Sequence, residues 1–147
     1  MAVNIVMGPP CSGKSTFIKN TFPDSKVIDL FDFQKDKSFV TVESVMESYI
    51  ETKDALVAAL KENKNVVLEH TLLRAIRREM YVKAIREVTD EPINIYVLIP
   101  EKATFIEFSK QRKCPTDDRY FMDLFGTLEI PTQEEGFANV YVIMPRI

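Results

Sequence analysis

The chain has 147 residues, of which 46% are hydrophobic, and its formal net charge is −3. A chain of this length fits one globular domain, so we expect a single domain over residues 1–147. The acidic balance excludes a global basic field that would attract nucleic acid over a distance, and a nucleic-acid ligand would therefore need a local basic groove. No run approaches the roughly 18 apolar residues of a spanning helix, which predicts a cytoplasmic protein without a membrane partner.

The two cysteines, Cys11 and Cys114, are far apart in the sequence and have no partners at metal-ligand spacing. This pattern indicates neither a zinc site nor a disulfide framework. We therefore expect reduced thiols, in agreement with a cytoplasmic location.

Short apolar runs alternate along the chain with segments of helical spacing. In chain order, the sequence predicts a strand at 3–7, a helix at 14–22, a strand at 26–30, a helix at 41–62, a strand at 66–69, a helix at 73–88, a strand at 93–99, helices at 103–113 and 118–125, and a strand at 140–143. Strands that alternate with helices and are apolar on both faces are typical of a parallel sheet covered on both sides. The sequence therefore predicts an α/β fold.

The most specific motif joins the first predicted strand to the first predicted helix. Residues 8–15 match the phosphate-binding pattern G-x-x-x-x-G-K-[ST] at every fixed position. In this pattern backbone N–H groups converge on an anion, Lys14 reaches the β- and γ-phosphates, and Ser15 offers its hydroxyl to Mg²⁺. A glycine-rich turn that only caps a helix would need neither the lysine nor this spacing. The predicted nucleotide-binding residues are Gly8, Pro9, Pro10, Cys11, Ser12, Gly13, Lys14, Ser15 and Thr16.

Two short segments bear on whether the nucleotide is GTP. Residues 63–66 begin like the guanine-reading pattern N-K-x-D, but Val66 stands in place of the aspartate and cannot accept a hydrogen bond from guanine. Residues 123–126 have the D-x-x-G spacing of a GTPase switch, but they follow the fourth predicted strand. We interpret both matches as coincidences, and the chain is small for a motor ATPase. The pattern therefore favours a compact ATP-dependent kinase.

Taken together, the motifs resemble the polynucleotide 5′-kinase and zeta-toxin branch of P-loop kinases. The similarity is carried by residues 8–15, 27–32, 66–71, 110–113 and 135–137, which occur in the expected order. It implies a three-layer P-loop kinase fold with a five-stranded parallel sheet of order 2-3-1-4-5. It also implies that ATP and Mg²⁺ are used to phosphorylate a hydroxyl, with a polynucleotide end as the first candidate. A small-molecule kinase and a non-catalytic ATP-binding module are the alternatives.

The resemblance places a catalytic base just after the second strand. In that branch an aspartate accepts the proton of the attacking hydroxyl, and both Asp29 and Asp32 lie in this stretch. We assign Asp32 as the base, with Asp29 as the alternative base and as an acceptor-binding residue. Either aspartate could instead only turn the chain after a strand.

Three polar residues lie where the third predicted strand ends, the position at which open parallel sheets bind their ligands. Thr71 matches a threonine that faces the acceptor in polynucleotide kinases, and we expect Thr71 and His70 to bind the acceptor. His70 stands where the branch often has aspartate, and a buried histidine without chemistry is equally compatible with the sequence. Glu69 could hold Mg²⁺ together with Ser15, or could only cap the next helix.

Two basic segments complete the predicted site. In the helix at 73–88, Arg77 and Arg78 are candidates for binding the phosphates of an oligonucleotide, although a solvated basic face is the simpler interpretation. Residues 110–119 resemble a short lid, and Arg112 is the candidate for stabilising the charge on the transferred phosphoryl group.

Overall fold

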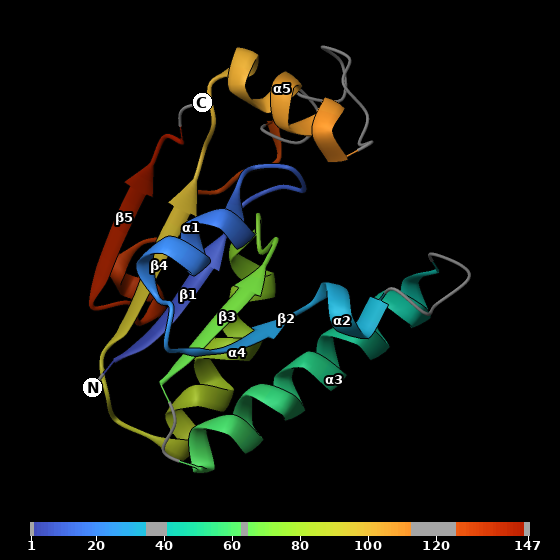
Figure 1. Cartoon of the computed structure of the whole chain (residues 1–147). Coiled ribbons are helices and arrows are strands. Elements are labelled where there is room, and N and C mark those ends of the chain that lie inside the picture. Colours follow the sequence, from blue (N-terminus) through green and yellow to red (C-terminus); the bar gives the residue numbers. More distant parts are fainter. Residues whose placement is uncertain (1, 35–40, 63–64, 113–125, 146–147) are drawn as a thin grey trace.

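The computed structural model describes residues 2–34, 41–62, 65–112 and 126–145. These residues form one five-stranded sheet in the order β2-β3-β1-β4-β5, in which all neighbouring strands are parallel (Figure 1). The strands are β1 (Val3–Met7), β2 (Lys26–Asp29), β3 (Val66–His70), β4 (Ile93–Leu98) and β5 (Asn139–Ile143). The prediction of an α/β fold with sheet order 2-3-1-4-5 is confirmed.

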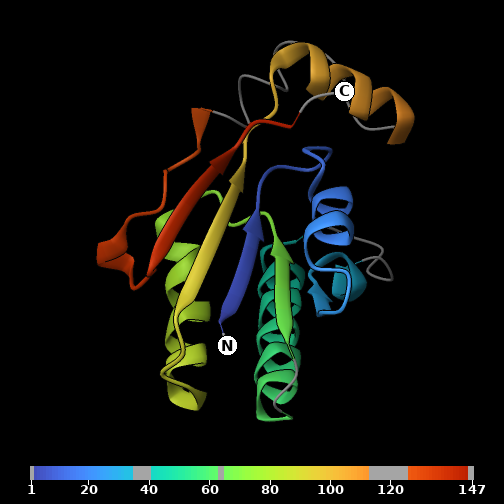
Figure 2. The same cartoon turned by 60° about the vertical axis from the view of Figure 1, so that its left-hand side comes forward.

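Helices cover both faces of the sheet. They are α1 (Lys14–Thr21), α2 (Phe31–Gln34), α3 (Val42–Lys61), α4 (Ala75–Val88) and α5 (Lys102–Arg112), and the 3₁₀ turn η1 (Gln133–Glu135) precedes β5. Figure 2 shows α3 and α4 on one face and α1 on the opposite face. In both views α5 lies beyond the carboxyl ends of the strands. The arrangement has the three layers that the sequence predicts.

The central strand β1 is held from both faces. Val3 and Met7 are buried in the larger core with Leu56 of α3, whereas Val6 is buried in the smaller core with Ile18 of α1. This alternation follows from the two-residue period of a strand. Burying one aliphatic side chain contributes about 1.5–3 kcal/mol, so the carboxyl end of β1 is a firmly placed starting point for the loop that follows it.

Two short elements, α2 and η1, were not predicted from the sequence. Neither α2 nor η1 has enough residues to show a period, and both begin with local hydrogen bonds. The Asp29 carboxylate accepts a hydrogen bond from the Phe31 N–H at 3.0 Å, which turns the chain from β2 into α2.

The helix predicted at 118–125 lies outside the described residues. In the described part of the chain, no helix combines the length and the apolar character that crossing a bilayer requires.

Candidate active site

The loop at residues 8–15, called the phosphate loop below, leaves the carboxyl end of β1 and enters α1. Gly13 has φ 90° and ψ 17°, a left-handed conformation that suits glycine. At Gly8 an added Cβ would lie 2.6 Å from Ser12 Oγ and 2.9 Å from the Leu98 carbonyl oxygen. The path of the chain therefore requires both fixed glycines of the motif.

Cys11 is the least expected residue of the phosphate loop. Its φ of 65° puts a non-glycine residue in the left-handed region, which costs of order 1 kcal/mol. The cysteine is also disulfide-bonded in the structure, so the prediction of a free thiol at this position is wrong. The spacing rules used for the sequence apply to disulfide frameworks and metal sites, and they do not detect one isolated pairing.

Lys14 curls back over the phosphate loop. Its Nζ donates hydrogen bonds to the carbonyl oxygens of Gly8 and Pro9, each at 2.9 Å. Beneath the loop, Ser12 Oγ is fully buried and has no hydrogen-bond partner among the described residues. Such a site fits an anionic ligand, which could accept a hydrogen bond from the buried Ser12 hydroxyl and pair with the Lys14 ammonium.

The carboxylate of Glu69 lies beside the first turn of α1. Ser15 Oγ donates to both Glu69 carboxylate oxygens, at 3.2 and 3.1 Å. Glu69 also pairs in register with Asp29 on the neighbouring strand. Because Glu69 is buried and faces Asp29, its pKa is raised to about 7. The helix α4 begins only at Ala75, so Glu69 does not cap it.

The donor set of Ser15 and Glu69 fits Mg²⁺, which prefers hydroxyl and carboxylate oxygens. In the described ranges, no group of three or more His, Cys, Asp or Glu side chains could hold a metal ion. Mg²⁺ in phosphoryl transfer is held by one or two carboxylates and completes its shell with phosphate oxygens and water. A divalent cation here would also replace the proton that Glu69 holds near neutral pH.

The two candidate aspartates lie in different surroundings. Asp29 lines a cavity of about 430 Å³ together with Lys14 and Thr71. Asp32 is an exposed residue in the first turn of α2 and lines an outer hollow of about 370 Å³ with Lys19. Asp29 also lines this outer hollow, as do Ser15 and Glu69.

The 430 Å³ cavity, called the acceptor cavity below, opens at the carboxyl ends of three strands. The phosphate loop, the end of β2 with α2, and the end of β3 each contribute to it. Its lining residues are Pro10, Cys11, Lys14, Ser15, Asp29, Leu30, Phe31, Gln34, Glu69, His70 and Thr71. Phe31 is the exposed aromatic side chain among them, with 63% of its surface accessible.

His70 is a buried, neutral histidine. Its Nε2 lies 2.8 Å from the hydroxyl of Tyr81, and its ring makes edge-to-face contacts with the rings of Tyr49 and Tyr81 at centroid distances of 4.7 and 4.9 Å. Burial, and then the charge of Lys14, lowers the pKa of His70 to about 3. The histidine therefore carries no positive charge toward an acceptor at neutral pH.

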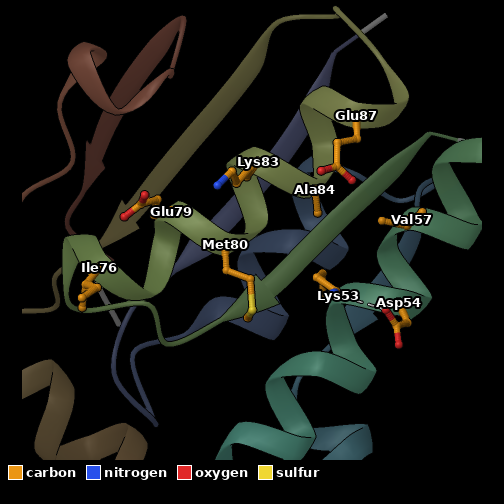
Figure 3. A pocket seen from close by; sticks show the side chains of 9 residues that line it. All are labelled: Lys53, Asp54, Val57, Ile76, Glu79, Met80, Lys83, Ala84 and Glu87. Atoms are coloured by element: carbon orange, nitrogen blue, oxygen red, sulfur yellow. Dashed lines mark ion pairs between the residues drawn. The ribbon is translucent and has the colours of Figure 1, made fainter.

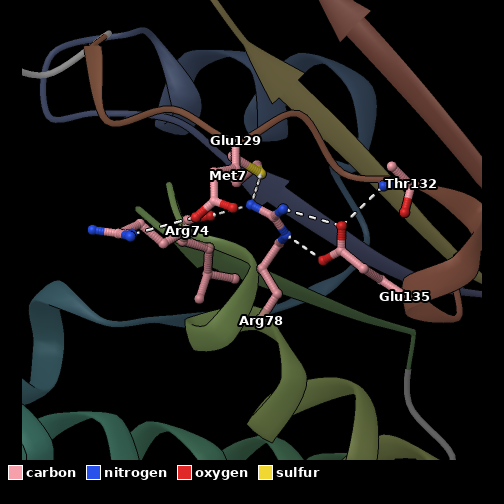
Figure 4. A network of polar contacts seen from close by, with 7 residues as sticks. Met7, Arg74, Arg78, Glu129, Thr132 and Glu135 are labelled. Carbon is pink, nitrogen blue, oxygen red and sulfur yellow. Dashed lines mark hydrogen bonds and ion pairs between the residues drawn. The ribbon is translucent and has the colours of Figure 1, made fainter.

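Arg78 does not reach solvent. Its guanidinium is fully buried and donates to both carboxylate oxygens of Glu135, at 2.8 and 3.1 Å, and to the Leu72 carbonyl oxygen at 2.8 Å (Figure 4). Leu72 is itself buried and left-handed, with φ 46°. We therefore leave Arg78 out of the proposed acceptor site, because a phosphate could reach it only by breaking these bonds.

The other predicted cations stay near the surface or outside the description. Arg77 is exposed, and its guanidinium carbon lies 5.8 Å from the centroid of the Tyr49 ring. Arg74 is also exposed and pairs with Glu129 at 3.3 Å (Figure 4). Arg112 is the last residue of α5, but its side chain and the remainder of the predicted lid, residues 113–119, lie outside the described residues.

Sequence reasoning missed the structural roles of Tyr81 and Glu135. A signal for part of this was present, because residues 78, 81, 82 and 85 share one helical face and three of them are apolar or aromatic. An arginine inside such a stripe is buried and needs a carboxylate partner. Nothing local in the sequence identifies Glu135 as that partner, since it lies 57 residues away.

A separate groove lies between α3 and α4 (Figure 3). It has a volume of about 520 Å³, and its lining includes Lys53, Glu79, Lys83 and Glu87. None of its lining residues belongs to the phosphate loop or the acceptor cavity. We assign it no part in phosphate chemistry.

Comparison with known proteins identifies the fold. No family model matches the sequence, and no curated protein matches it. A sugar kinase from Janibacter sp. HTCC2649 matches with a TM-score of 0.71 and 14% identity, over 98% of this chain and 85% of that chain. A gluconokinase from Sinorhizobium meliloti 1021 matches with a TM-score of 0.66 and 14% identity, over 97% and 82%.

A third similar structure is a chain of the Pnkp1/Rnl/Hen1 RNA repair complex. It matches with a TM-score of 0.71 and 18% identity, over 86% of this chain and 43% of that chain. The three matches share the α/β architecture of P-loop kinases, and the chain described here has this fold. At these identities the likeness extends to the fold alone.

Proposed function

We propose that the protein is an ATP-dependent kinase that transfers the γ-phosphoryl group of ATP to a hydroxyl. The observation that carries the proposal is that the phosphate loop and the residues facing the acceptor line one cavity. Lys14 and Ser15 of the phosphate loop line the same cavity as Asp29 and Thr71. A module that only bound ATP would need the loop, but it would not need a carboxylate and a hydroxyl facing the place where the γ-phosphate would lie.

Residues 8–16 would bind the phosphates of ATP, with Lys14 on the β- and γ-phosphates. Binding would exchange the carbonyl oxygens that now hold the Lys14 ammonium for phosphate oxygens, which are stronger partners because they are charged. Ser15 and Glu69 would hold Mg²⁺, with Asp29 beside them. When bound, the metal would neutralise part of the negative charge on the β- and γ-phosphates.

The transfer step needs a base near the acceptor. The acceptor oxygen forms a bond to the γ-phosphorus, its proton passes to an aspartate, and the bond from the γ-phosphorus to the bridging oxygen breaks to release ADP. We propose Asp29 as this base, because it lines the acceptor cavity. Asp32, the assignment made from the sequence, is the second candidate, and Arg112 is the proposed lid cation.

For the acceptor, we propose a polynucleotide end. The supporting observation is Phe31, a largely exposed aromatic ring that lines the acceptor cavity. Stacking of a base on such a ring contributes about 1–3 kcal/mol and tolerates any sequence. Arg77 adds an exposed positive charge on α4 that could reach a phosphate. A sugar or nucleoside is the alternative, since a sugar kinase and a gluconokinase share this fold.

One experiment separates these possibilities. The protein is incubated with γ-labelled ATP and Mg²⁺ together with 5′-hydroxyl DNA, 5′-hydroxyl RNA, nucleosides or sugars in parallel, and Lys14→Ala serves as the inactive control. Label in an oligonucleotide supports the proposal, and label only in a nucleoside or sugar supports the alternative. ATP binding without transfer to any acceptor contradicts a kinase and supports a binding module.

A further inference from the structure

A chain of three hydrogen-bonding groups leads from the acceptor cavity to α3. Thr71 Oγ1 lies 3.5 Å from His70 Nδ1, and His70 Nε2 lies 2.8 Å from the Tyr81 hydroxyl. The Tyr81 hydroxyl in turn lies 3.1 Å from the Tyr49 carbonyl oxygen and donates to it. Of the two hydroxyl groups in this chain, that of Thr71 belongs to a residue that lines the cavity, whereas Tyr81 is fully buried.

The direction of these hydrogen bonds follows from the Tyr49 carbonyl, which can only accept. The Tyr81 hydroxyl has one hydrogen, and it donates this hydrogen to the Tyr49 carbonyl oxygen at 3.1 Å. The Tyr81 oxygen must then accept from His70, so the neutral ring carries its proton on Nε2. His70 Nδ1 is left with a lone pair, and the Thr71 hydroxyl is the donor in their contact.

We infer that Tyr81 is a positioning residue, which acts through His70 to turn the hydroxyl hydrogen of Thr71 inward and its lone pairs toward the acceptor cavity. Thr71 would then receive a hydrogen bond from the acceptor substrate, so the site selects an acceptor that offers an O–H or N–H at this point. The inference rests on the proposed function for its substrate. Its structural part, the Nε2–H tautomer, does not depend on activity.

The contact between Thr71 and His70 is long, so the hydrogen bond adds little binding energy. Its effect is to orient the hydroxyl hydrogen of Thr71. A hydroxyl rotates among staggered positions of similar energy, so an acceptor at Nδ1 favours the position in which the hydrogen points to it. In the opposite tautomer, Nδ1–H would donate to Thr71, and Thr71 would present its hydrogen to the cavity. The two tautomers therefore give the cavity opposite hydrogen-bonding character.

His70 is the single histidine of the chain, so its nitrogen resonances can be assigned without ambiguity. We expect two-bond ¹⁵N–¹H correlation spectra of the full-length protein at pH 7 to show the Nε2–H tautomer. In Thr71→Val the tautomer should stay the same while the Nδ1 resonance shifts, because its hydrogen bond is lost, and Thr71→Ser should restore it. The Nδ1–H tautomer in the wild-type protein would overturn the inference. An Nδ1 resonance whose chemical shift is unchanged in Thr71→Val would overturn it as well.

Kinetics test the link to the substrate, with a 5′-hydroxyl DNA oligonucleotide as the probe. Tyr81→Phe should raise KM for the oligonucleotide about 10-fold with little change in KM for ATP. If Tyr81 acts through Thr71, Thr71→Val should raise it similarly, and the double variant should be no worse than Thr71→Val alone. Additive effects of the two substitutions would mean that Tyr81 acts independently of Thr71 and would overturn the positioning role.

The two proposals can fail separately. A protein that has the Nε2–H tautomer but transfers no label to any acceptor would refute the kinase and leave the hydrogen-bond directions intact. An active kinase with the Nδ1–H tautomer would refute the positioning role of Tyr81 and leave the kinase intact. If Tyr81→Phe does not fold, the wild-type spectrum and the Thr71 variants still decide.

Discussion

The phosphate loop and the turn at residues 69–74, called the β3 turn below, both lie at the carboxyl end of the sheet, but they are built differently. The phosphate loop takes its shape from its own residues, because Gly8 and Gly13 allow its path and Lys14 bonds to its carbonyl oxygens. The β3 turn contains the left-handed Leu72, and its shape depends on partners from elsewhere in the chain. Arg78 holds the Leu72 carbonyl, and the Glu129 N–H donates to the Leu73 carbonyl at 2.8 Å.

This difference separates what binds phosphate from what chooses an acceptor. A loop made of consecutive residues can work in any protein with a strand before it and a helix after it, which is why the phosphate loop is common to many activities. The β3 turn is specified by α4 and by the segment before β5, so it can change as those elements change. We expect substitutions at the loop to abolish transfer and substitutions behind the β3 turn to act through stability and acceptor binding.

The largest expected effect is at the phosphate loop. Lys14→Ala should lower phosphoryl transfer about 10⁴-fold, the middle of the range for a cation that contacts the transferred phosphoryl group. The free energy of unfolding should change by less than about 1 kcal/mol, since the side chain is only partly buried. Lys19→Ala on the same helix is the matched control and should keep full activity. A Lys14→Ala protein with more than a tenth of wild-type activity would contradict the assignment of the loop.

The second prediction concerns the support behind the β3 turn. Arg78→Leu should lower the free energy of unfolding by about 3–5 kcal/mol, because it leaves Glu135 and the Leu72 carbonyl without their buried partner. The matched control is Arg74→Leu on the same helix, whose pair with Glu129 is exposed and contributes about 0–1 kcal/mol. Urea unfolding followed by circular dichroism measures both. Equal losses for the two variants would refute the buried ion pair as the support of the turn.

The same contrast explains how much could be predicted from the sequence. The α/β class and the phosphate loop depend on periodicity and on consecutive residues, and both can be recognised from short stretches of the chain. The sheet order was an expectation from the resemblance to P-loop kinases. The strand and helix that frame the loop were expected at 3–7 and 14–22, and they occur at Val3–Met7 and Lys14–Thr21.

The side of the site that faces the acceptor could be predicted only in part. The carboxyl ends of β2 and β3 were expected to meet, and Asp29 and Glu69 do lie in register there. The sequence could not decide that His70 is a buried histidine, because its neighbours Tyr49 and Tyr81 come from helices that precede and follow it. Arg78 looked like a surface cation since a charged helix is usually solvated, and its burial depends on the distant Glu135.

The third prediction separates the two aspartates. Asp29→Asn should lower kcat at least about 10²-fold, the lower range for loss of a general base. ATP binding should weaken less, because the phosphate loop stays intact. Asp32→Asn is the matched substitution and should keep kcat within a few-fold of wild type, since Asp32 lines the outer hollow and not the acceptor cavity. Steady-state kinetics of the two variants decide between them, and the reverse outcome would restore the assignment made from the sequence.

The smallest expected effect is a pH dependence of stability in which Glu69 and His70 act in opposite directions. The pKa of His70 falls from 6.5 to about 3 on folding, so between these values the unfolded chain binds more protons and acid lowers stability. The pKa of Glu69 rises from 4.5 to about 7, so in that window the folded chain binds more protons and acid raises stability. In the wild-type protein these contributions should nearly cancel between pH 4.5 and 6.5.

Removing either group should uncover the other. In Glu69→Gln, lowering the pH from 7 to 4.5 should reduce the free energy of unfolding by about 2–3 kcal/mol relative to wild type, because only His70 still responds. In His70→Asn the same change should increase it relative to wild type by an amount of the same order. Urea unfolding at several pH values without added metal measures both slopes. Parallel pH profiles for wild type and both variants would mean that the end of β3 is open to water, and that the β3 turn is no more enclosed than the phosphate loop.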